Sequence, residues 1–385
     1  MLWVDKHRPT QLKQLSCHPE TNARLEALAA DPASLPHLLF YGPPGAGKKT
    51  RINSLLRSIY GPGAERLRLD KRTFTTPTKR SVDINMISSN YHIEISPGDA
   101  GINDRYVVQE VIKEMAANKN ISSVSGAAPA PAPAGSSEDG AAANPAAPAG
   151  RRPKVDYKVV VLVEVEKLSR QAQAALRRTM EKYSQSCRLI LCCNNQSRVI
   201  DPVRSRCLGV RVAAPGHDSI CSILRGVARK EGLTLPEELA VDLARSSGRN
   251  LRRALLMMES CHVQNRDASG TGLKAGTPVQ RADWEVYIQQ LAKDVTREQS
   301  PQRLLAAREK LYELLINCIP ADVILKTLAL ELMKNLDDSL KHEVVEAAAF
   351  YEHRIATGSK DIFHLEAFVA KYMAVYKRYL NEMFA

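Results

Sequence analysis

The residue pattern with the most specific chemistry is a glycine-rich stretch, YGPPGAGKKT, near the start of the chain. It fits the phosphate-binding loop G-x-x-x-x-G-K-[ST] at every defined position except the last. In such a loop, backbone N–H groups surround the phosphate oxygens and the lysine neutralises the β- and γ-phosphates. We predict that ATP or ADP is bound here by Gly42, Gly45, Ala46, Gly47 and Lys48.

The position after that lysine departs from the pattern, because Lys49 stands where a serine or threonine would ligate magnesium. An ammonium group has no lone pair and cannot ligate a metal ion. Thr50 lies about 100° further round a helix and would not face the same oxygen. We predict that Mg²⁺ is weakly held. The alternative is that Lys49 points to solvent and a water replaces the missing hydroxyl.

A second departure lies in the apolar run KVVVLVEVEKL. A Walker B strand ends in Asp-Glu, of which the aspartate holds magnesium through water and the glutamate orients the attacking water. Here Val163 takes the aspartate position and Glu164 the glutamate position, so Glu164 is the candidate catalytic residue that would orient the attacking water. Glu166 could replace the missing carboxylate, or it could face solvent. Two magnesium contacts are missing, which predicts weak hydrolysis.

Basic residues gather in two further places. The loop DPVRSRCLG is rich in arginine. Most such loops are simply solvated, but beside a phosphate an arginine can raise the reaction rate by about 10³–10⁵. The helix predicted at 169–183 carries Arg177, Arg178 and Glu181 outside its apolar stripe. These residues form either a salt-bridged solvated face or a surface for DNA or a neighbour's nucleotide.

Three apolar runs, at 37–42, 158–168 and 188–195, predict the strands that position these residues. The first leads into the glycine-rich loop and then a helix at 49–61, whose apolar residues recur at helical spacing. Repeated strand–helix units predict an α/β fold, with a parallel sheet and helices flanking both faces.

The chain has 385 residues, which suits two or three domains. Residues 1–213 form the predicted nucleotide-binding domain. An Ala/Pro-rich insert at 122–153 interrupts it and is predicted to be disordered, because it contains too few large apolar side chains to fold. Helical patterns then predict a small lid at 214–262, a linker at 263–280 and an all-α domain at 281–385.

Composition restricts the function classes. The net charge of +12 is compatible with a polyanionic partner such as nucleic acid. No apolar run reaches about 18 residues, so we expect no membrane span. The eight cysteines are scattered without a C-x-x-C pair, so we expect no metal site built on them, and reduced thiols as in a nuclear or cytosolic protein.

Several motifs are specific enough to indicate a family: LWVDKHRP, GPPGAGKKT, NYHIEISPGDAG, ALRRTMEKYS, SRC, CIPADVI and GSKDIFHLEAFVAK. They resemble the small subunits of replication factor C, the clamp loader of the AAA+ class. Within that family they are most similar to the branch called subunit three in animals and subunit five in budding yeast. The resemblance covers nearly the whole chain except the insert. It implies an AAA+ P-loop domain, a helical lid and a helical collar that holds five subunits in a ring.

The resemblance also assigns roles in nucleotide handling. Arg206 of the SRC motif is similar to the arginine that completes a neighbouring subunit's site in trans. Asn194 and Arg252 match the residues called sensor 1 and sensor 2. Val4 and Arg8 fall where the family contacts the adenosine end of the nucleotide. One departure from the motifs is His7, which replaces the usual tyrosine.

The implied function is loading of a sliding clamp, proliferating cell nuclear antigen, onto primer–template DNA in the nucleus during replication and repair. The partners are the other subunits of a heteropentamer, and no membrane is involved. Arg105, Lys113 and Arg177 lie where the family faces the DNA backbone. Two alternatives remain: a structural subunit with a vestigial nucleotide pocket, and an independent P-loop ATPase acting on nucleic acid, such as a helicase.

Overall fold

The computed structural model describes residues 1–75, 81–117, 157–265, 273, 278–334 and 336–384. The chain divides into two compact units, Met1–Val279 and Gln280–Ala385. The insert predicted at 122–153 and most of the linker predicted at 263–280 lie outside the described residues.

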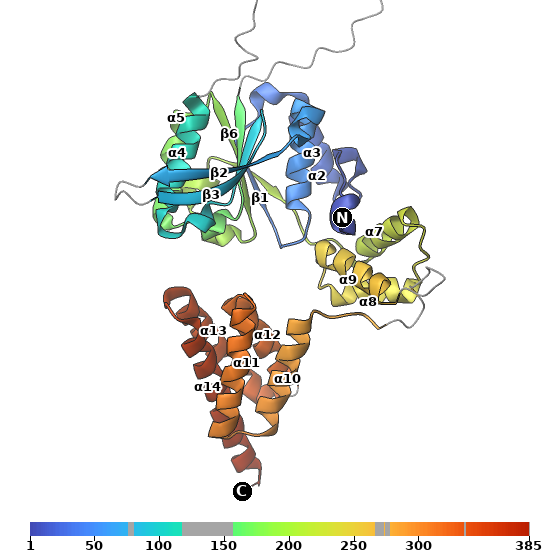
Figure 1. Ribbon diagram of the computed structural model, residues 1–385, viewed down its shortest axis with the longest axis vertical. Coiled ribbons are helices and arrows are strands. Elements are labelled where there is room, and N and C mark those ends of the chain that lie inside the picture. Colours follow the sequence, from blue (N-terminus) through green and yellow to red (C-terminus); the bar gives the residue numbers. More distant parts are fainter. Residues whose placement is uncertain (76–80, 118–156, 266–272, 274–277, 335, 385) are drawn as a thin grey trace, which may run out of the picture. The chain divides into compact units, whose positions relative to one another are not determined.

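The described part of the first unit contains a seven-stranded sheet in the order β2-β3-β4-β5-β6-β1-β7 (Figure 1). The strands are β1 Leu38–Tyr41, β2 Arg68–Thr75, β3 Ser81–Ser88, β4 His92–Ile95, β5 Lys158–Leu162, β6 Cys187–Cys193 and β7 Leu208–Arg211. Five of them pair in parallel, as predicted. The prediction missed the antiparallel pairs β2–β3 and β3–β4, so the sheet is mixed. β2 is mostly charged and polar, with only Leu69 and Phe74 apolar, and therefore lacks the continuous apolar run of a buried strand.

Both faces of the sheet are apolar, which is why helices cover both. Leu39 and Val160 face one core cluster, while the neighbouring Phe40 and Val161 face another. Helices α4 Asp104–Ala117 and α5 Arg170–Lys182 pack on the first face, and α2 Pro19–Ala30 and α3 Lys48–Tyr60 on the second (Figure 1). The α/β fold class is confirmed.

A small helical group follows the sheet in the same unit. It contains α7 His217–Lys230, α8 Glu237–Ser246 and α9 Leu251–Gln264, and the N-terminal helix α1 Trp3–Lys6 joins its core. Trp3 stacks on His262 with ring centroids 5.3 Å apart. The Asn250 side chain accepts a hydrogen bond from Arg253 N and caps the start of α9. The contact of Trp3 with α9 therefore joins the start of this unit's sequence to the last helix of the unit.

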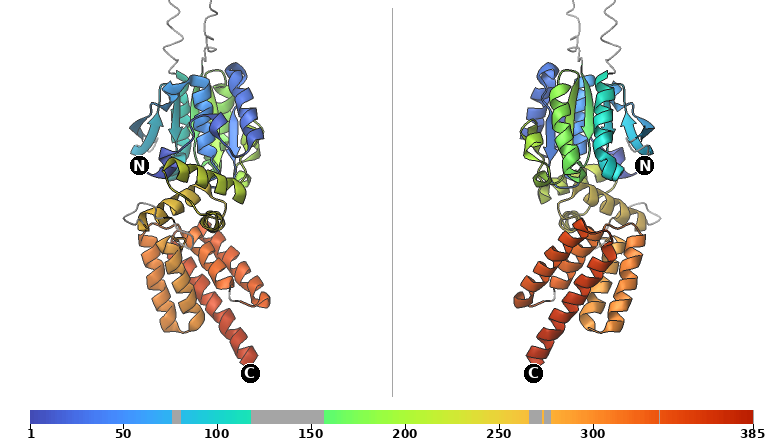
Figure 2. Two further views of the ribbon diagram at one scale, coloured as in Figure 1. Left: turned by 90° about the vertical axis from the view of Figure 1, so that its right-hand side faces the viewer. Right: turned by 90° about the vertical axis from the view of Figure 1, so that its left-hand side faces the viewer.

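The second unit is a helical bundle (Figure 2). Its helices are α10 Asp283–Arg297, α11 Pro301–Ile316, α12 Ala321–Met333, α13 Asp338–Thr357 and α14 Asp361–Phe384. The apolar stripe of α14 is buried as its spacing indicates, with Leu365, Phe368 and Tyr372 nearly inaccessible. No helix in the described ranges is long and apolar enough to cross a membrane.

Candidate functional site

The glycine-rich loop connects the end of β1 to the start of α3, the position that a phosphate-binding loop requires. Gly42 and Gly45 have φ angles of 151° and 73°, which L side chains rarely adopt. A Cβ atom at Gly42 would lie 1.9 Å from the Val212 carbonyl oxygen, and one at Gly45 1.8 Å from Asn250 Oδ1. The loop is therefore closely packed between the end of β7 and the first residue before α9.

Lys48 lies inside this loop and is only 7% exposed. Its Nζ donates hydrogen bonds to the carbonyl oxygens of Gly42 at 2.7 Å and Pro43 at 2.9 Å, and to Asn194 Oδ1 at 2.8 Å. Burial lowers the pKa of Lys48 from its ordinary value, and Arg252 of α9 also acts in that direction. Lys48 is therefore hydrogen-bonded to one predicted sensor residue, Asn194, and lies within electrostatic range of the other, Arg252.

Glu166 faces Asn194 rather than solvent. Its Oε1 accepts hydrogen bonds from Asn194 Nδ2 at 2.8 Å and from the Asn194 backbone N at 3.0 Å. Its Oε2 is buried and has no hydrogen-bond partner among the described residues. The chain Lys48–Asn194–Glu166 joins residues beyond the carboxyl ends of three parallel strands, where α/β sheets place their ligands.

Glu164, the predicted catalytic acid, is oriented differently. β5 ends at Leu162, and Glu164 adopts a left-handed backbone conformation with φ of 56°. Its carboxylate forms an ion pair with Lys167 Nζ at 2.7 Å and is 42% exposed. Of the two glutamates that follow β5, Glu166 is therefore the one that contacts the predicted sensor residue Asn194.

Lys49 does not point freely into solvent. It forms an ion pair with Glu94, a largely buried residue of β4, while Thr50 lies half-buried beside it in α3. Two positions fit phosphate groups better than they fit magnesium, since an ammonium occupies the usual hydroxyl position and Val163 the usual carboxylate position. Glu166 Oε2, a buried carboxylate oxygen without a hydrogen-bond partner in the described chain, fits a cation instead.

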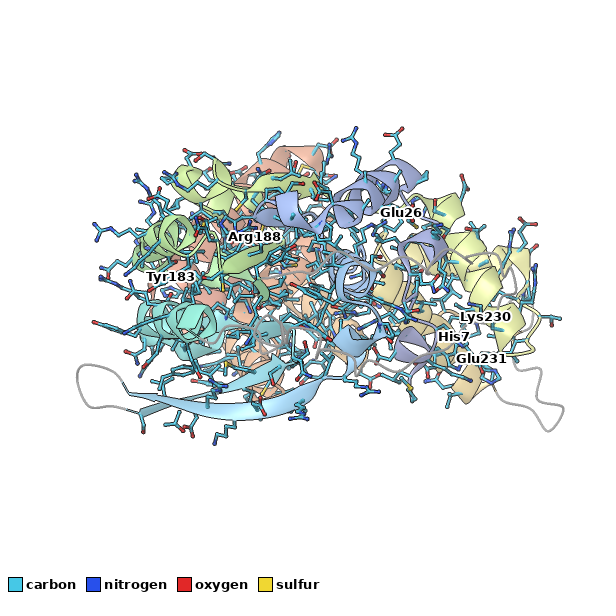
Figure 3. All side chains as sticks on the ribbon, turned by 90° about the horizontal axis from the view of Figure 1, so that it is seen from above. His7, Glu26, Tyr183, Arg188, Lys230 and Glu231 are labelled. Carbon is cyan, nitrogen blue, oxygen red and sulfur yellow. The ribbon has the colours of Figure 1, made fainter. Side chains whose placement is uncertain are left out.

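The N-terminal segment lies against the helical group α7–α9. Val4 packs on the apolar core of that group. Arg8 forms an ion pair with Asp5, 3.0 Å from Nη2 to Oδ1. His7 Nε2 is hydrogen-bonded to Glu231 Oε1 at the end of α7, and the two side chains lie together in Figure 3. Val4 therefore lies within α1 against this helical group, and Arg8 follows α1 and is tied back to it by Asp5.

Arg206 follows the short helix α6 Asp201–Arg204. Its Nε and Nη2 both lie 2.7 Å from Glu181 Oε1 at the end of α5. Its Nη1 donates to the Pro202 carbonyl oxygen at 2.8 Å. The Arg206 side chain is 31% exposed, so part of the guanidinium remains accessible.

Arg105, Lys113 and Arg177 are exposed on the outer faces of α4 and α5. Asp104, which is buried, holds the two helices together at their starts. Its Oδ2 accepts a hydrogen bond from Ser169 N at 2.6 Å, and its Oδ1 accepts one from Ser169 Oγ at 3.0 Å. The basic residues of the two helices are therefore presented on one side of the sheet.

The structure adds residues that the sequence patterns did not reveal: Glu94, Asn250, Arg51 and the contact of Glu181 with Arg206. Glu94 carries the clearest signal, since it is a charged residue within the apolar strand HIEI. Arg51 lies four residues before Leu55 and so shares the apolar face of α3. Nothing local to positions 250 or 181 indicates their partners.

Comparison with known proteins identifies the family to which this chain belongs. RuvB of Thermotoga maritima, a Holliday junction branch migration motor, has a TM-score of 0.43 at 14% identity, covering 79% of this chain and 85% of that one. The family described as "RCF1/5-like, AAA+ ATPase lid domain" matches residues 222–263, and "Replication factor C subunit 3, C-terminal domain" matches 284–380. Replication factor C subunit 3 of Bos taurus is 49% identical over 381 residues, 99% of this chain and 98% of the relative. Replication factor C subunit 5 of Oryza sativa subsp. japonica is 48% identical over 387 residues, 100% of both chains. The chain belongs to the replication factor C family of small clamp-loader subunits with the AAA+ fold.

Proposed function

We propose that this subunit binds ATP or ADP firmly, hydrolyses it weakly in its own site, and supplies Arg206 to a neighbouring subunit's nucleotide. The observation that carries the proposal is the ion pair of Lys49 with Glu94. It puts a protein cation where a magnesium ligand would be, while the glycine-rich loop and Lys48 keep what phosphate binding requires. The site keeps the groups that hold phosphates and lacks two of the usual contacts for the metal, at Lys49 and Val163.

The assembly proposed for this chain is a heteropentamer with the other replication factor C subunits. Residues 281–385 act as its collar. With ATP bound, the complex opens proliferating cell nuclear antigen and surrounds a primer–template junction, and hydrolysis releases the clamp around DNA. The work belongs to DNA replication and repair in the nucleus. The net charge of +12 favours the polyanionic partner.

Arg206 suits a role in trans because of how it is held. Its hydrogen-bond partners are residues of this same chain, namely Glu181, Pro202 and Ser205. The loop that carries it leaves the guanidinium partly accessible. An arginine fork of this kind matches the charge of a transferring phosphoryl group.

The DNA-facing residues of the proposal are Arg105, Lys113 and Arg177. All three are exposed, and long basic side chains on neighbouring helices can follow a phosphate backbone without reading its sequence. Arg177 lies 3.8 Å from Glu181, too far for a tight pair. It is therefore available to a phosphate.

The proposal separates two mutations in the reconstituted complex. Arg206→Ala should lower DNA-stimulated ATPase by about 10²-fold or more, since it removes transition-state charge stabilisation. Lys48→Ala should lower it only a few-fold, because this subunit's own site contributes little turnover.

Assembly of both variants is checked by size-exclusion chromatography. Equal loss of ATPase in the two assembled complexes would contradict the division of labour. Wild-type complex that binds no nucleotide at this subunit would favour a vestigial pocket instead.

A further inference from the structure

A buried arginine lies directly beneath the phosphate-binding loop. Arg51, in the first turn of α3, is 1% exposed and heads the largest fully buried side chains in the described residues. Its Nη1 donates to the carbonyl oxygens of Ala46 at 3.2 Å and Gly47 at 3.4 Å. Its Nη2 donates to the Cys17 carbonyl oxygen at 2.7 Å, and its Nε to Asn22 Oδ1 at 3.1 Å.

None of these acceptors carries a charge, and in the described part of the chain Arg51 has no carboxylate partner. Burial lowers the pKa of Arg51, but a guanidinium keeps its proton in proteins. A buried charge without a counter-ion is unfavourable in the folded protein. The four hydrogen bonds offset part of that cost, and an anion bound near the loop would offset more of it.

The geometry shows where that charge would be. In a trans peptide the C=O and the following N–H point in opposite directions. The Arg51 side chain holds the carbonyl oxygens of Ala46 and Gly47, and its backbone N–H also donates to Gly47 O at 3.1 Å. The N–H groups of Gly47 and Lys48 therefore point the other way, toward the phosphate side of the loop. The start of α3 adds its partial positive charge in the same direction.

The other cations of the loop have acids nearby. Lys49 is paired with Glu94, and the negative charge of Glu166 opposes the lowering that burial causes in the pKa of Lys48. We infer that Arg51 is a positioning residue for phosphate, which aims the loop's N–H groups and provides from beneath the loop part of the positive charge that magnesium provides in related sites. The inference rests on nucleotide binding at this loop and goes beyond it by making that binding depend little on metal.

A purely structural role for Arg51 is the competing explanation, since the same guanidinium ties the loop to residues 15–22. Asn22 Nδ2 extends that tie by donating to the carbonyl oxygens of Leu15 at 2.9 Å and Cys17 at 3.1 Å. The two explanations differ in what the charge does. A structural role needs only the hydrogen bonds of Arg51. Phosphate positioning also needs the positive charge of Arg51 to have no negative group of the chain beside it.

Position 17 allows the charge to be changed without touching those hydrogen bonds. Arg51 binds the backbone oxygen of Cys17, not its side chain. The half-buried thiol is within electrostatic range of the guanidinium, which opposes the rise that burial causes in the pKa of Cys17. Cys17→Asp and Cys17→Asn are matched in size, and only the first brings a negative charge to Arg51.

The experiment measures ATP and ADP affinity of the full chain by calorimetry, in Mg²⁺ and in EDTA, together with the thermal midpoint without nucleotide. Cys17→Asp should bind ATP roughly tenfold more weakly than Cys17→Asn, and ADP less affected than ATP because it carries less charge. The thermal midpoint of Cys17→Asp should equal or exceed that of Cys17→Asn, because the buried charge gains a partner. A structural role alone would move affinity and stability together.

Equal ATP affinity of the two Cys17 variants, or joint loss of affinity and thermal midpoint in Cys17→Asp, would overturn the inference. Arg51→Lys should keep more ATP affinity than Arg51→Gln, and the reverse order would also count against it. A wild-type chain that binds neither ATP nor ADP would remove the proposed function and this inference together. A wild-type chain that binds both nucleotides, with no difference between the Cys17 variants, removes only the inference.

Discussion

Lys49 and Glu94 illustrate how one residue changes the chemistry of a familiar loop. The ammonium lies in an ion pair with the carboxylate of Glu94 in strand β4, and the Glu94 side chain is only 11% exposed. Such a partly buried pair is retained more firmly than a surface pair, because solvent screens it less. The position that would ligate magnesium is therefore occupied by an internal cation and its counter-ion.

Replacing that cation should restore metal dependence. In Lys49→Thr the hydroxyl can ligate magnesium and Glu94 loses its partner, so ATP affinity should rise several-fold on adding Mg²⁺. The wild-type affinity should change little under the same titration. Lys49→Met is the matched control, since it removes the ammonium without supplying a ligand. A wild-type affinity that already depends strongly on Mg²⁺ would contradict this account.

Glu181 should matter for the reaction although it is remote from Lys48 in sequence. It fixes the Nε and Nη2 edge of Arg206, and an exposed pair worth about 0–1 kcal/mol can orient an arginine without withholding it from a triphosphate. Glu181→Gln should therefore lower DNA-stimulated ATPase of the reconstituted complex roughly three- to tenfold, with unchanged ATP affinity. Lys182→Gln on the same helix is the control. An increased rate in Glu181→Gln would show that the pair restrains Arg206 instead.

At the scale of elements, the N-terminal helix α1 is joined to the helical group that follows the sheet. Trp3 N donates to Glu259 Oε2 at 3.1 Å, and Lys6 and His7 both pair with Glu231. Glu231 ends α7, whereas Arg252 and the cap Asn250 begin α9 beside the phosphate-binding loop. The N-terminal helix α1 and the glycine-rich loop therefore both lie against this helical group.

The Glu231 contact should show a defined pH dependence. Hydrogen bonds from Lys6 and His7 hold the pKa of Glu231 below its ordinary value of 4.5. Its contribution to stability is therefore fully present above pH 4.5 and is lost as pH falls through the folded-state value. The thermal midpoint of Glu231→Gln should lie below that of the wild type at pH 7, and the difference should shrink below pH 4.5. Glu26→Gln on α2 serves as the control, and a difference that persists at low pH would contradict the assignment.

At the scale of the whole molecule, the chain consists of two units, each with its own core. The second unit buries Leu311, Leu328, Leu365 and Phe368 without contributions from the first. It also exposes large apolar side chains on its helices: Leu305, Ile316, Phe350 and Phe363. These side chains are available for the subunit contacts of the proposed collar.

The second unit should therefore fold alone. A fragment of residues 280–385 is expected to show a helical circular dichroism spectrum and a cooperative thermal transition, because its core is complete. The full chain should show a transition at the same temperature. The melting curve of a fragment of residues 1–279 is measured as well, so that the first unit's transition can be recognised in the curve of the full chain. An unfolded 280–385 fragment would mean that the two units depend on each other for stability.

Local patterns in the sequence determined much of this protein. The order of glycines and Lys48 predicted a phosphate-binding loop, the apolar runs predicted β1, β5 and β6, and family motifs identified the clamp-loader family. These features are local because a helix, a strand or a loop depends on residues within one or two turns of chain. The departure at Lys49 was equally visible, since it is defined by its place in a short motif.

Only the tertiary structure decided the partners. Glu94 meets Lys49, Asn194 meets Lys48 and Glu166, Glu181 meets Arg206, and Cys17 meets Arg51. These contacts depend on strand order and on the angle at which α5 packs on the sheet, which no short window of sequence contains. Side-chain direction after β5 is a further case. Both Glu164 and Glu166 follow the strand, but the left-handed turn at Glu164 brings Glu166 to Asn194 and leaves Glu164 with Lys167.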